Sequence, residues 1–324
     1  MKKRIALVTG GFSGEAVVSY QSAKTVSENI DREKYEVYTI DISPEGWHYL
    51  NGEVKTVVDR NDFSINLGDR KVLFDAVLMC IHGSPGEDGK LQGYFDILGI
   101  PYTSCDATVS AITFNKRYTV SVASFSGINV ARSVLLIKNR VENRDSVKQL
   151  NYPVFVKPNN GGSSIGMSKV ASAAEVETAI EKAFKEDSQV LVEEFIEGRE
   201  LTIGVFRKNN EVICLPMTEI ISKNYFFDYE AKYHGKSDEI TPAAVDGEVA
   251  EKIRGTAKKI YNLFNCRGVI RIDFIYNEKQ KQPFMLEINT VPGQSAASLI
   301  PQQVKAMGMD LKEFYSILIE EAFV

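Results

Sequence analysis

Several features that mark other classes of protein are scarce or absent in this sequence. The 324 residues include four cysteines, Cys80, Cys105, Cys214 and Cys266, and no C-x-x-C pair. Cys80 and Cys214 lie in apolar, strand-like runs, so we expect buried free thiols rather than a zinc site or a nucleophilic cysteine. No apolar run approaches the roughly 18 residues of a transmembrane helix. The formal net charge of −5 argues against bulk binding of nucleic acid.

The start of the chain also lacks a complete targeting signal. Residues 1–4 read Met-Lys-Lys-Arg, as in a signal peptide, but the apolar segment 5–8 is too short and runs into Thr-Gly-Gly. We therefore expect a cytoplasmic protein without a membrane partner. Internal repeats and low-complexity segments are absent. Because 44% of the residues are hydrophobic, the chain can bury a large core, and its length predicts two or three domains.

The most informative segment is residues 269–293, which read V-I-R-I-D-F-I-Y, a polar turn, and F-M-L-E-I-N-T-V-P-G. Both halves alternate with period two, so we predict two strands joined by a short hairpin loop. Arg271 and Asp273 share one face of the first strand. Glu287 and Asn289 share one face of the second.

Two interpretations of these four polar residues are open. An antiparallel hairpin commonly has one solvated face, which is the simpler interpretation. Here the charges alternate with Val, Ile and Met, which favours partial burial, and a buried charge has to be paired or to hold a metal. Carboxylate and amide oxygens suit Mg²⁺, and Arg271 can hold a phosphate. By analogy with other Mg²⁺–phosphate sites, the pattern favours a functional site over a solvated strand face.

Two loops in the N-terminal part follow predicted buried strands. Residues 10–15 read G-G-F-S-G-E and precede a predicted helix, and residues 82–89 read H-G-S-P-G-E-D-G. Ligands of parallel sheets bind beyond the carboxyl ends of the strands, but such loops are also ordinary tight turns. The first loop matches neither G-x-G-x-x-G nor G-x-x-x-x-G-K-[ST]. Glu15 could cap the helix or bind a substrate ammonium, and His82 could be structural or contact substrate.

The middle of the chain carries candidate nucleotide contacts. Residues 107–125 are predicted to be helical and include Lys116. Strand 153–156 leads into Lys157 and a loop rich in Gly and Ser, whose N–H groups could cradle phosphates; a merely flexible loop is the alternative. A lysine in an apolar strand is energetically unfavourable unless it is paired. This favours the interpretation as a phosphate-binding site over a merely flexible loop.

The next strand ends in two glutamates and predicts a hinge between domains. Backbone exposed at Glu193 and Glu194 could bind an adenine edge, and Glu200 a ribose hydroxyl, although acidic strand ends are usually just solvated. Residues 222–243 are polar and aromatic, without a regular period. Loops this long inside a domain are usually functional lids.

In this order along the whole chain, these motifs resemble those of the D-alanine–D-alanine ligases of the ATP-grasp superfamily. The motifs that carry the resemblance are Gly10-Gly11-x-Ser13-x-Glu15, His82-Gly83 with Gly86-Glu87-Asp88-Gly89, Lys157-Pro158 with Gly162-Ser163-Ser164-x-Gly166-Met167, residues 193–200, Tyr229-Glu230-Ala231-Lys232-Tyr233, Arg271-x-Asp273, and Glu287-x-Asn289-Thr290-x-Pro292-Gly293.

The resemblance implies an α/β fold of the ATP-grasp type. An N-terminal parallel-sheet (preATP-grasp) domain at 1–104 would bind the first substrate. Two α+β domains, at 105–196 and at 197–324, would clamp ATP, the last one carrying the metal site and the lid loop. The implied activity is ATP-dependent ligation of two D-alanines to D-alanyl-D-alanine through an acyl phosphate, for peptidoglycan precursor synthesis and cell-wall formation. Family resemblance also implies a homodimer.

The resemblance further implies roles for individual residues. ATP would be bound by Lys116, Lys157, Ser164, Glu193, Glu194, Ile196, Glu200 and Lys232. Two Mg²⁺ or Mn²⁺ ions would be held by Asp273, Glu287 and Asn289. Arg271 and the Gly293 amide would stabilise the reacting groups, and Glu15 would orient the first ammonium together with Ser163 and Tyr233. Substrate would also contact His82, Ser298 and Leu299.

Three positions depart from the family pattern and put acceptor selectivity in doubt: Ala16 in place of a basic residue, Ser295-Ala296-Ala297 in place of Thr-Ser-His, and Glu194 in place of lysine. The rival functions are another ATP-grasp carboxylate–amine ligase, a ligase forming D-alanyl-D-lactate, and a non-catalytic nucleotide-binding regulator. The last is disfavoured because a regulator does not need Arg271, Asp273, Glu287 and Asn289.

Overall fold

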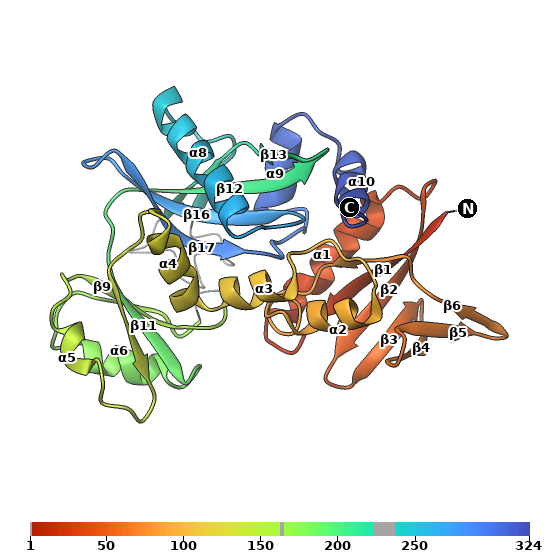
Figure 1. Ribbon diagram of the computed structural model, residues 1–324, viewed down its shortest axis with the longest axis horizontal. Helices are drawn as coiled ribbons and strands as arrows, with labels where there is room; N and C mark the ends of the chain where they lie inside the picture. Colours follow the sequence, from red (N-terminus) through yellow and green to blue (C-terminus); the bar gives the residue numbers. More distant parts are fainter. Residues whose placement is uncertain (1, 163–164, 223–236) are drawn as a thin grey trace.

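The structure is a computed structural model that describes residues 2–162, 165–222 and 237–324. The chain forms three units that differ in colour in Figure 1: an N-terminal unit in red and orange, a central unit in yellow-green, and a C-terminal unit in green and blue. No helix among the described residues is long and apolar enough to cross a membrane. The predicted lid at 222–243 falls mostly on residues 223–236, which lie outside the described residues.

The N-terminal unit is a sheet of order β6-β5-β4-β3-β2-β1-β7. The predicted parallel part is confirmed, because β1 (Lys3–Gly10) pairs in parallel with β2 (Tyr35–Ser43) and β7 (Ala76–Met79). The rest is an antiparallel meander made of β3 (Gly46–Asn51), β4 (Val54–Asp59), β5 (Ser64–Leu67) and β6 (Arg70–Val72). The helices are α1 (Ala16–Asn29) and α2 (Lys90–Leu98).

The strands of the meander are short and are joined by tight turns. These turns depend on left-handed backbone, with φ of +61° at Gly52 and +62° at Gly68. Glycine adopts this conformation without steric cost. Alternation in such short strands is too brief to be recognised by period alone.

The central unit contains an antiparallel sheet of order β10-β9-β11-β8. Its elements are β8 (Ser133–Ile137), α5 (Arg144–Val147), β9 (Val154–Pro158), β10 (Ser168–Val170), α6 (Val176–Ala183) and β11 (Gln189–Glu194). One hydrophobic cluster fills the space between this sheet and its helices, and it runs from Leu136 to Val192 in sequence. The central sheet therefore has a core of its own.

The predicted helical segment at 107–125 is confirmed, but it consists of two helices, α3 (Ala107–Phe114) and α4 (Lys116–Phe125), that meet at Asn115. Asn115 has extended backbone, with φ −90° and ψ 104°, and its side chain accepts a hydrogen bond from the Tyr118 amide at 3.0 Å. It thus ends one helix and caps the next. Both helices pack against the C-terminal unit, since Val109 and Ala123 belong to its core cluster.

The C-terminal unit is a sheet of order β15-β14-β12-β16-β17, with β13 paired to β12. Its strands are β12 (Arg199–Lys208), β13 (Glu211–Cys214), β14 (Thr218–Ser222), β15 (Ser237–Ile240), β16 (Ile270–Asn277) and β17 (Gln282–Asn289). The predicted antiparallel hairpin is confirmed in β16 and β17. Helices α8 (Gly247–Leu263), α9 (Leu299–Ala306) and α10 (Leu311–Glu321) complete the unit.

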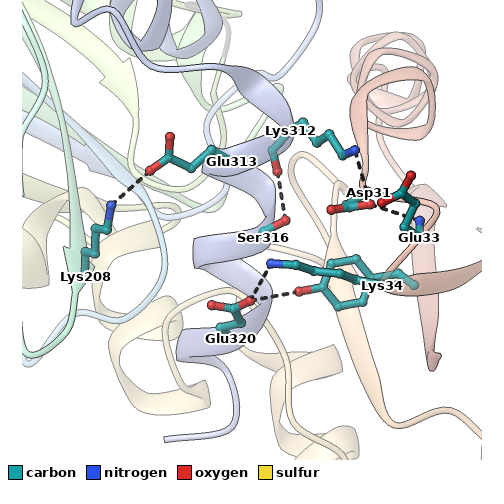
Figure 2. Close-up of polar contacts among 9 residues, drawn as sticks. Asp31, Glu33, Lys34, Lys208, Lys312, Glu313, Ser316 and Glu320 are labelled. Atoms are coloured by element: carbon teal, nitrogen blue, oxygen red, sulfur yellow. Dashed lines mark hydrogen bonds and ion pairs between the residues drawn. The ribbon is translucent and has the colours of Figure 1, made fainter. Parts of the chain in front are cut away.

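Helix α10 joins the C-terminal unit to the N-terminal unit. Apolar residues of β1, β12 and α10 form one continuous cluster that includes Ile5, Phe206 and Phe314. Ion pairs lie along α10, as Figure 2 shows. They connect Lys34 with Glu320 at 3.3 Å, Lys312 with Asp31 at 3.4 Å and Lys208 with Glu313 at 3.0 Å.

The four cysteines are free, as predicted. Cys80, Cys105 and Cys266 are buried, and Cys214 is half-buried. Burial raises the pKa of Cys214 to about 11, so this thiol stays protonated and unreactive at neutral pH.

Candidate active site

A cavity of about 1130 Å³ is lined by residues of all three units. Every described residue that the sequence put forward for a site lines this cavity: Glu15, His82, Lys116, Lys157, Glu193, Glu194, Ile196, Glu200, Arg271, Asp273, Glu287, Asn289, Gly293, Ser298 and Leu299. Ser163, Ser164, Lys232 and Tyr233 lie outside the described residues. The candidates, which are spread over most of the sequence, are thus brought to one place.

The strands β16 and β17 bring four of these side chains together. Asp273 lies directly opposite Glu287, and Arg271 lies opposite Asn289. The Arg271 guanidinium donates two hydrogen bonds to Asp273, both at 2.9 Å. Asp273 also accepts from the Thr202 hydroxyl at 2.5 Å and from Asn289 Nδ2 at 3.3 Å. Alternation of period two, combined with antiparallel register, forces this grouping.

The charge of Arg271 is secured by its neighbours. Burial by itself lowers the pKa of Arg271, but the charge of Asp273 and its hydrogen bonds to the guanidinium outweigh burial and raise that pKa. Glu287 and Glu87 contribute in the same direction. A permanent planar cation with several donors suits a phosphoryl group or a developing oxyanion.

The donor set on these strands fits a hard divalent cation. Two carboxylates and one amide oxygen, on Asp273, Glu287 and Asn289, belong to adjacent strands and line the cavity. Oxygen ligands of this kind suit Mg²⁺, which also keeps water or substrate oxygens. Among the described residues, no group of three or more His, Cys, Asp or Glu could hold a metal.

Glu15 lies where the N-terminal and central units meet. Glu15 stands at the N-cap position of α1, at the helix start as the sequence suggests, but its side chain makes no capping hydrogen bond to that helix. A Cβ added at Gly83 would lie 2.7 Å from Glu15 Oε2, and one added at Gly162 would lie 2.7 Å from Oε1. Glycines of two units therefore fit closely around this carboxylate.

His82 is structurally satisfied and still lines the cavity. Its ring Nε2 lies 3.0 Å from the Ser22 hydroxyl, and its backbone amide donates to the Ser19 hydroxyl at 2.9 Å. Burial, together with the nearby Arg271 charge, lowers the pKa of His82 to about 4. The imidazole is neutral at physiological pH, so it can position a group but cannot supply a proton as an imidazolium.

Sequence reasoning gave no role to Glu87, which also lines the cavity. Burial and the neighbouring Glu15 charge raise its pKa to about 8. Its carboxylate accepts hydrogen bonds from the Gly83 amide at 2.7 Å and from the Val291 amide at 3.3 Å. The one signal in the sequence was its position in a glycine-rich loop after a buried strand.

The central unit contributes lysines that are engaged by the protein. Lys157 and Glu193 form an ion pair across β9 and β11. The Lys116 ammonium donates to the Gly161 carbonyl at 2.5 Å. The Glu194 carboxylate accepts from the Asn151 amide at 2.8 Å, so its side chain is held by the protein.

The segment before α9 forms another part of the wall. The hydroxyls of Ser295 and Ser298 lie 2.7 Å apart, and Gln302 Nε2 donates to the Ala297 carbonyl at 2.9 Å. A Cβ at Gly293 would lie 2.6 Å from Ser298 Oγ. Glycine is therefore needed where the backbone approaches the helix start.

Among the described residues that line the cavity, acidic side chains outnumber basic ones. Of the described lining residues, four carry a lysine or arginine cation: Lys116, Lys157, Arg199 and Arg271. Ten carry a carboxyl group: Glu15, Glu87, Glu186, Glu193, Glu194, Glu200, Glu219, Glu239, Asp273 and Glu287.

Comparison with known proteins accounts for the whole chain. Residues 4–105 match the family described as D-ala D-ala ligase N-terminus, and residues 119–320 match D-ala D-ala ligase C-terminus. A D-alanine–D-alanine ligase of Phocaeicola vulgatus is 45% identical over 325 residues, covering 100% of both chains.

Solved structures agree with the sequence relatives. The VanG D-Ala:D-Ser ligase of Enterococcus faecalis is 34% identical, with a TM-score of 0.89, covering 99% of this chain and 100% of that one. The D-alanine–D-alanine ligase of Bacillus anthracis, solved in complex with ATP, is 27% identical, with a TM-score of 0.80, covering 99% and 97%. With the described parts of the predicted motifs gathered in one cavity and both family models matched in order, the chain belongs to the D-alanine–D-alanine ligase family of ATP-grasp enzymes.

Proposed function

We propose that this ligase joins two D-alanine molecules into D-alanyl-D-alanine and converts ATP to ADP and phosphate. A carboxylate oxygen of the first D-alanine attacks the γ-phosphorus, ADP leaves, and an acyl phosphate forms. The amine of the second D-alanine then attacks the carbonyl carbon, and phosphate leaves as the amide bond forms. The dipeptide would serve peptidoglycan synthesis in the cytoplasm. The observation that carries the proposal is the joining of Arg271, Asp273, Glu287 and Asn289 in a cavity with Glu15 and two lysines.

The nucleotide would lie between the central and C-terminal units. Lys116 and Lys157 would bind phosphates, beneath the loop that contains Ser164, and Lys232 would approach the phosphates from the lid segment. The adenine would contact Glu193 and the backbone of Glu194 and Ile196, and Glu200 would accept from the ribose. Phosphate binding by Lys157 has to compete with its ion pair to Glu193. Nucleotide binding would therefore exchange an ion pair within the protein for one between Lys157 and a phosphate.

Asp273, Glu287 and Asn289 would hold two Mg²⁺ or Mn²⁺ ions. Such ions neutralise charge on the β- and γ-phosphates. Asp273 is already held by Arg271, Thr202 and Asn289, which fixes the orientation of one ligand before any cation is bound.

The amino acids would occupy the side of the cavity formed by the N-terminal unit and the start of α9. Glu15, with Ser163 and Tyr233, would orient the ammonium of the first D-alanine, and His82 would contact the same substrate. Arg271 and the Gly293 amide would stabilise the oxyanion. Ser298 and Leu299 would line the acceptor site. Since no side chain acts as a nucleophile, catalysis rests on positioning and electrostatics.

Product analysis tests this function. The purified protein is incubated with ATP, Mg²⁺ and a panel of D-alanine, D-serine, D-lactate and L-alanine, and ADP and products are quantified. We expect D-alanyl-D-alanine to dominate and L-alanine to be a poor substitute. D-serine and D-lactate belong in the panel because Ser295-Ala296-Ala297 departs from the family pattern. ADP release that is indifferent to D-alanine would disprove the proposal.

The division into domains at 1–104, 105–196 and 197–324, and a homodimer, are also part of this proposal. Light scattering of the purified protein tests the dimer, with a monomer as the contradicting result. Limited proteolysis tests the boundaries, because exposed segments between domains are cleaved first.

A further inference from the structure

Glu87 connects two units of the protein through one carboxylate. Oε2 accepts from the amide of Gly83, in the same loop of the N-terminal unit, at 2.7 Å. Oε1 accepts from the amide of Val291, in the C-terminal unit, at 3.3 Å. The two donors are 208 residues apart in sequence, so a single side chain spans a junction that borders the cavity.

The Gly83 contact leads directly to Glu15. Gly83 has a left-handed φ of +68°, and an added Cβ would lie 2.7 Å from both Glu15 Oε2 and Ser13 Oγ. Any shift of the Gly83 backbone therefore moves the surface against which the Glu15 carboxylate is packed. The hydrogen bond from Gly83 to Glu87 fixes that backbone.

The Val291 contact leads to the opposite end of the reaction. Val291 comes two residues after Asn289 and two residues before Gly293. Both neighbours line the cavity, one on β17 and the other in the turn before α9. A hydrogen bond at Val291 therefore fixes the short link between the strand and the turn.

We propose that Glu87 is a positioning residue that holds the ammonium site at Glu15 in register with the phosphoryl-transfer site at Asn289 and Gly293. The inference rests on the proposed function and adds a residue to it. In-line transfer needs the donor carboxylate at near-attack distance from the γ-phosphorus, and a displacement of 1 Å can cost about a hundredfold in rate. Glu87 acts through the backbone that it holds and does not touch the reacting atoms.

A purely structural role explains the side chain less well. Two backbone donors need only acceptor oxygens, and burying a second carboxylate near Glu15 opposes its ionisation. The position of both donors beside cavity-lining residues is what a link between two subsites requires. The structural alternative remains measurable, because it predicts a loss of stability without a selective loss of catalysis.

The test compares Glu87→Gln with a matched control, Asp75→Asn. Asp75 also accepts a backbone hydrogen bond, from the Arg4 amide at 2.7 Å, but at the amino-terminal edge of the same sheet, where β1 and β7 begin. The D-alanine dependence of ADP release is fitted for donor and acceptor sites separately. Nucleotide affinity and thermal unfolding are measured for both variants.

For Glu87→Gln we expect kcat/KM for the donor D-alanine to fall about tenfold to hundredfold, on the scale of one misaligned reacting group. Nucleotide affinity should stay within about twofold of wild type, since Glu87 lies on the amino-acid side. Asp75→Asn should lose stability alone. Donor kinetics of Glu87→Gln that match those of Asp75→Asn would overturn the proposal.

A second measurement keeps the inference separate from the proposed function. Hydrogen exchange at the Gly83 and Val291 amides should accelerate together in Glu87→Gln and stay unchanged in Asp75→Asn. If the wild-type protein made no dipeptide, the proposed function would fail, yet this exchange would still report the link. If Glu87→Gln did not fold, Glu87→Asp would decide, because its shorter carboxylate cannot reach both amides; unchanged exchange at both would refute the link.

Discussion

The C-terminal unit is joined to its two neighbours in different ways. Its junction with the N-terminal unit is apolar and continuous, since Ile5 of β1, Phe206 of β12 and Phe314 of α10 share one core. The central sheet has a separate core. It meets α4 through polar contacts instead, in which the Lys116 and Arg117 amides donate to the backbone and side chain of Asn159 at 3.0 and 2.9 Å.

From this difference between an apolar and a polar junction, we infer which parts of the cavity wall can move independently. Separating an apolar junction exposes core surface to water, at about 25 cal/mol per Å². Separating a polar junction exchanges protein hydrogen bonds for hydrogen bonds to water, at a smaller net cost of about 1 kcal/mol each. We therefore expect the N-terminal and C-terminal units, with the proposed amino-acid and metal subsites, to move as one rigid body, and the strand that carries Lys157 to belong to another.

The largest expected effect concerns the shared core. Phe314→Ala should lower the free energy of unfolding by about 3–5 kcal/mol, because it leaves a large cavity between two units. Hydrogen exchange should accelerate in both β1 and β12. The matched control is Ile180→Ala in the central core, which should destabilise by about 2–5 kcal/mol and accelerate exchange in the central sheet alone. Unchanged hydrogen exchange in β1 of Phe314→Ala would contradict the claim that the N-terminal and C-terminal units share one core.

The second largest effect is expected on turnover. Glu287→Gln keeps the shape of the side chain but removes a charge from the rigid body, so turnover at saturating Mg²⁺ should fall at least about a hundredfold. Weak nucleotide binding should persist, because the proposed adenine contacts lie elsewhere in the cavity. Circular dichroism checks the fold, and kinetics across Mg²⁺ concentrations check the metal. Near-normal turnover with unchanged metal dependence would contradict the proposal that Glu287 binds the metal.

Acid should act on the rigid body through His82, whose folded pKa is lowered from 6.5 to about 4. A depressed folded pKa contributes stability above pH 6.5, and that contribution is lost as pH falls through 4 because the unfolded chain binds the proton first. At about 1.4 kcal/mol per pKa unit, the loss is roughly 3 kcal/mol.

His82→Gln removes the titrating ring, so its unfolding free energy should fall less than that of wild type between pH 7 and pH 4. Denaturant unfolding at several pH values measures the difference. Parallel pH profiles for the two proteins would show that the imidazole is not a source of acid sensitivity.

The smallest effect belongs to the ion pairs around α10 (Figure 2). The side chains of Lys34 and Glu320 are 55% and 58% exposed, and exposed pairs are typically worth less than about 1 kcal/mol. A double-mutant cycle of Lys34→Ala and Glu320→Ala should give a coupling in that range, smaller still at high salt. A coupling of several kcal/mol would mean that charge, and not the apolar core, holds the junction.

The sequence could predict those parts of the site that depend on local order. Alternation along the two strands placed Arg271 and Asp273 on one face of β16. It likewise placed Glu287 and Asn289 on one face of β17. Antiparallel pairing then made the two sets neighbours. The loops after β1 and β7 were likewise predictable, because ligands in open parallel sheets lie beyond the carboxyl ends of strands.

Features that depend on distant partners could not be predicted. Glu87 gains its significance from the Val291 amide, 204 residues further along the chain. The break at Asn115 required a capping geometry that competes with the helical pattern on both sides. The packing of α3 and α4 on the C-terminal core also escapes prediction, because an apolar helix face does not specify which sheet will cover it.

The excess of carboxyl groups among the described lining residues of the cavity bears on how the nucleotide arrives. A bare triphosphate that approaches a cleft of its own sign meets a repulsive field, which slows association. A nucleotide that already carries divalent counter-ions meets a weaker one. Added monovalent salt shortens the Debye length, and should therefore speed the association of bare nucleotide with this protein, where it would slow association with a basic phosphate-binding cleft.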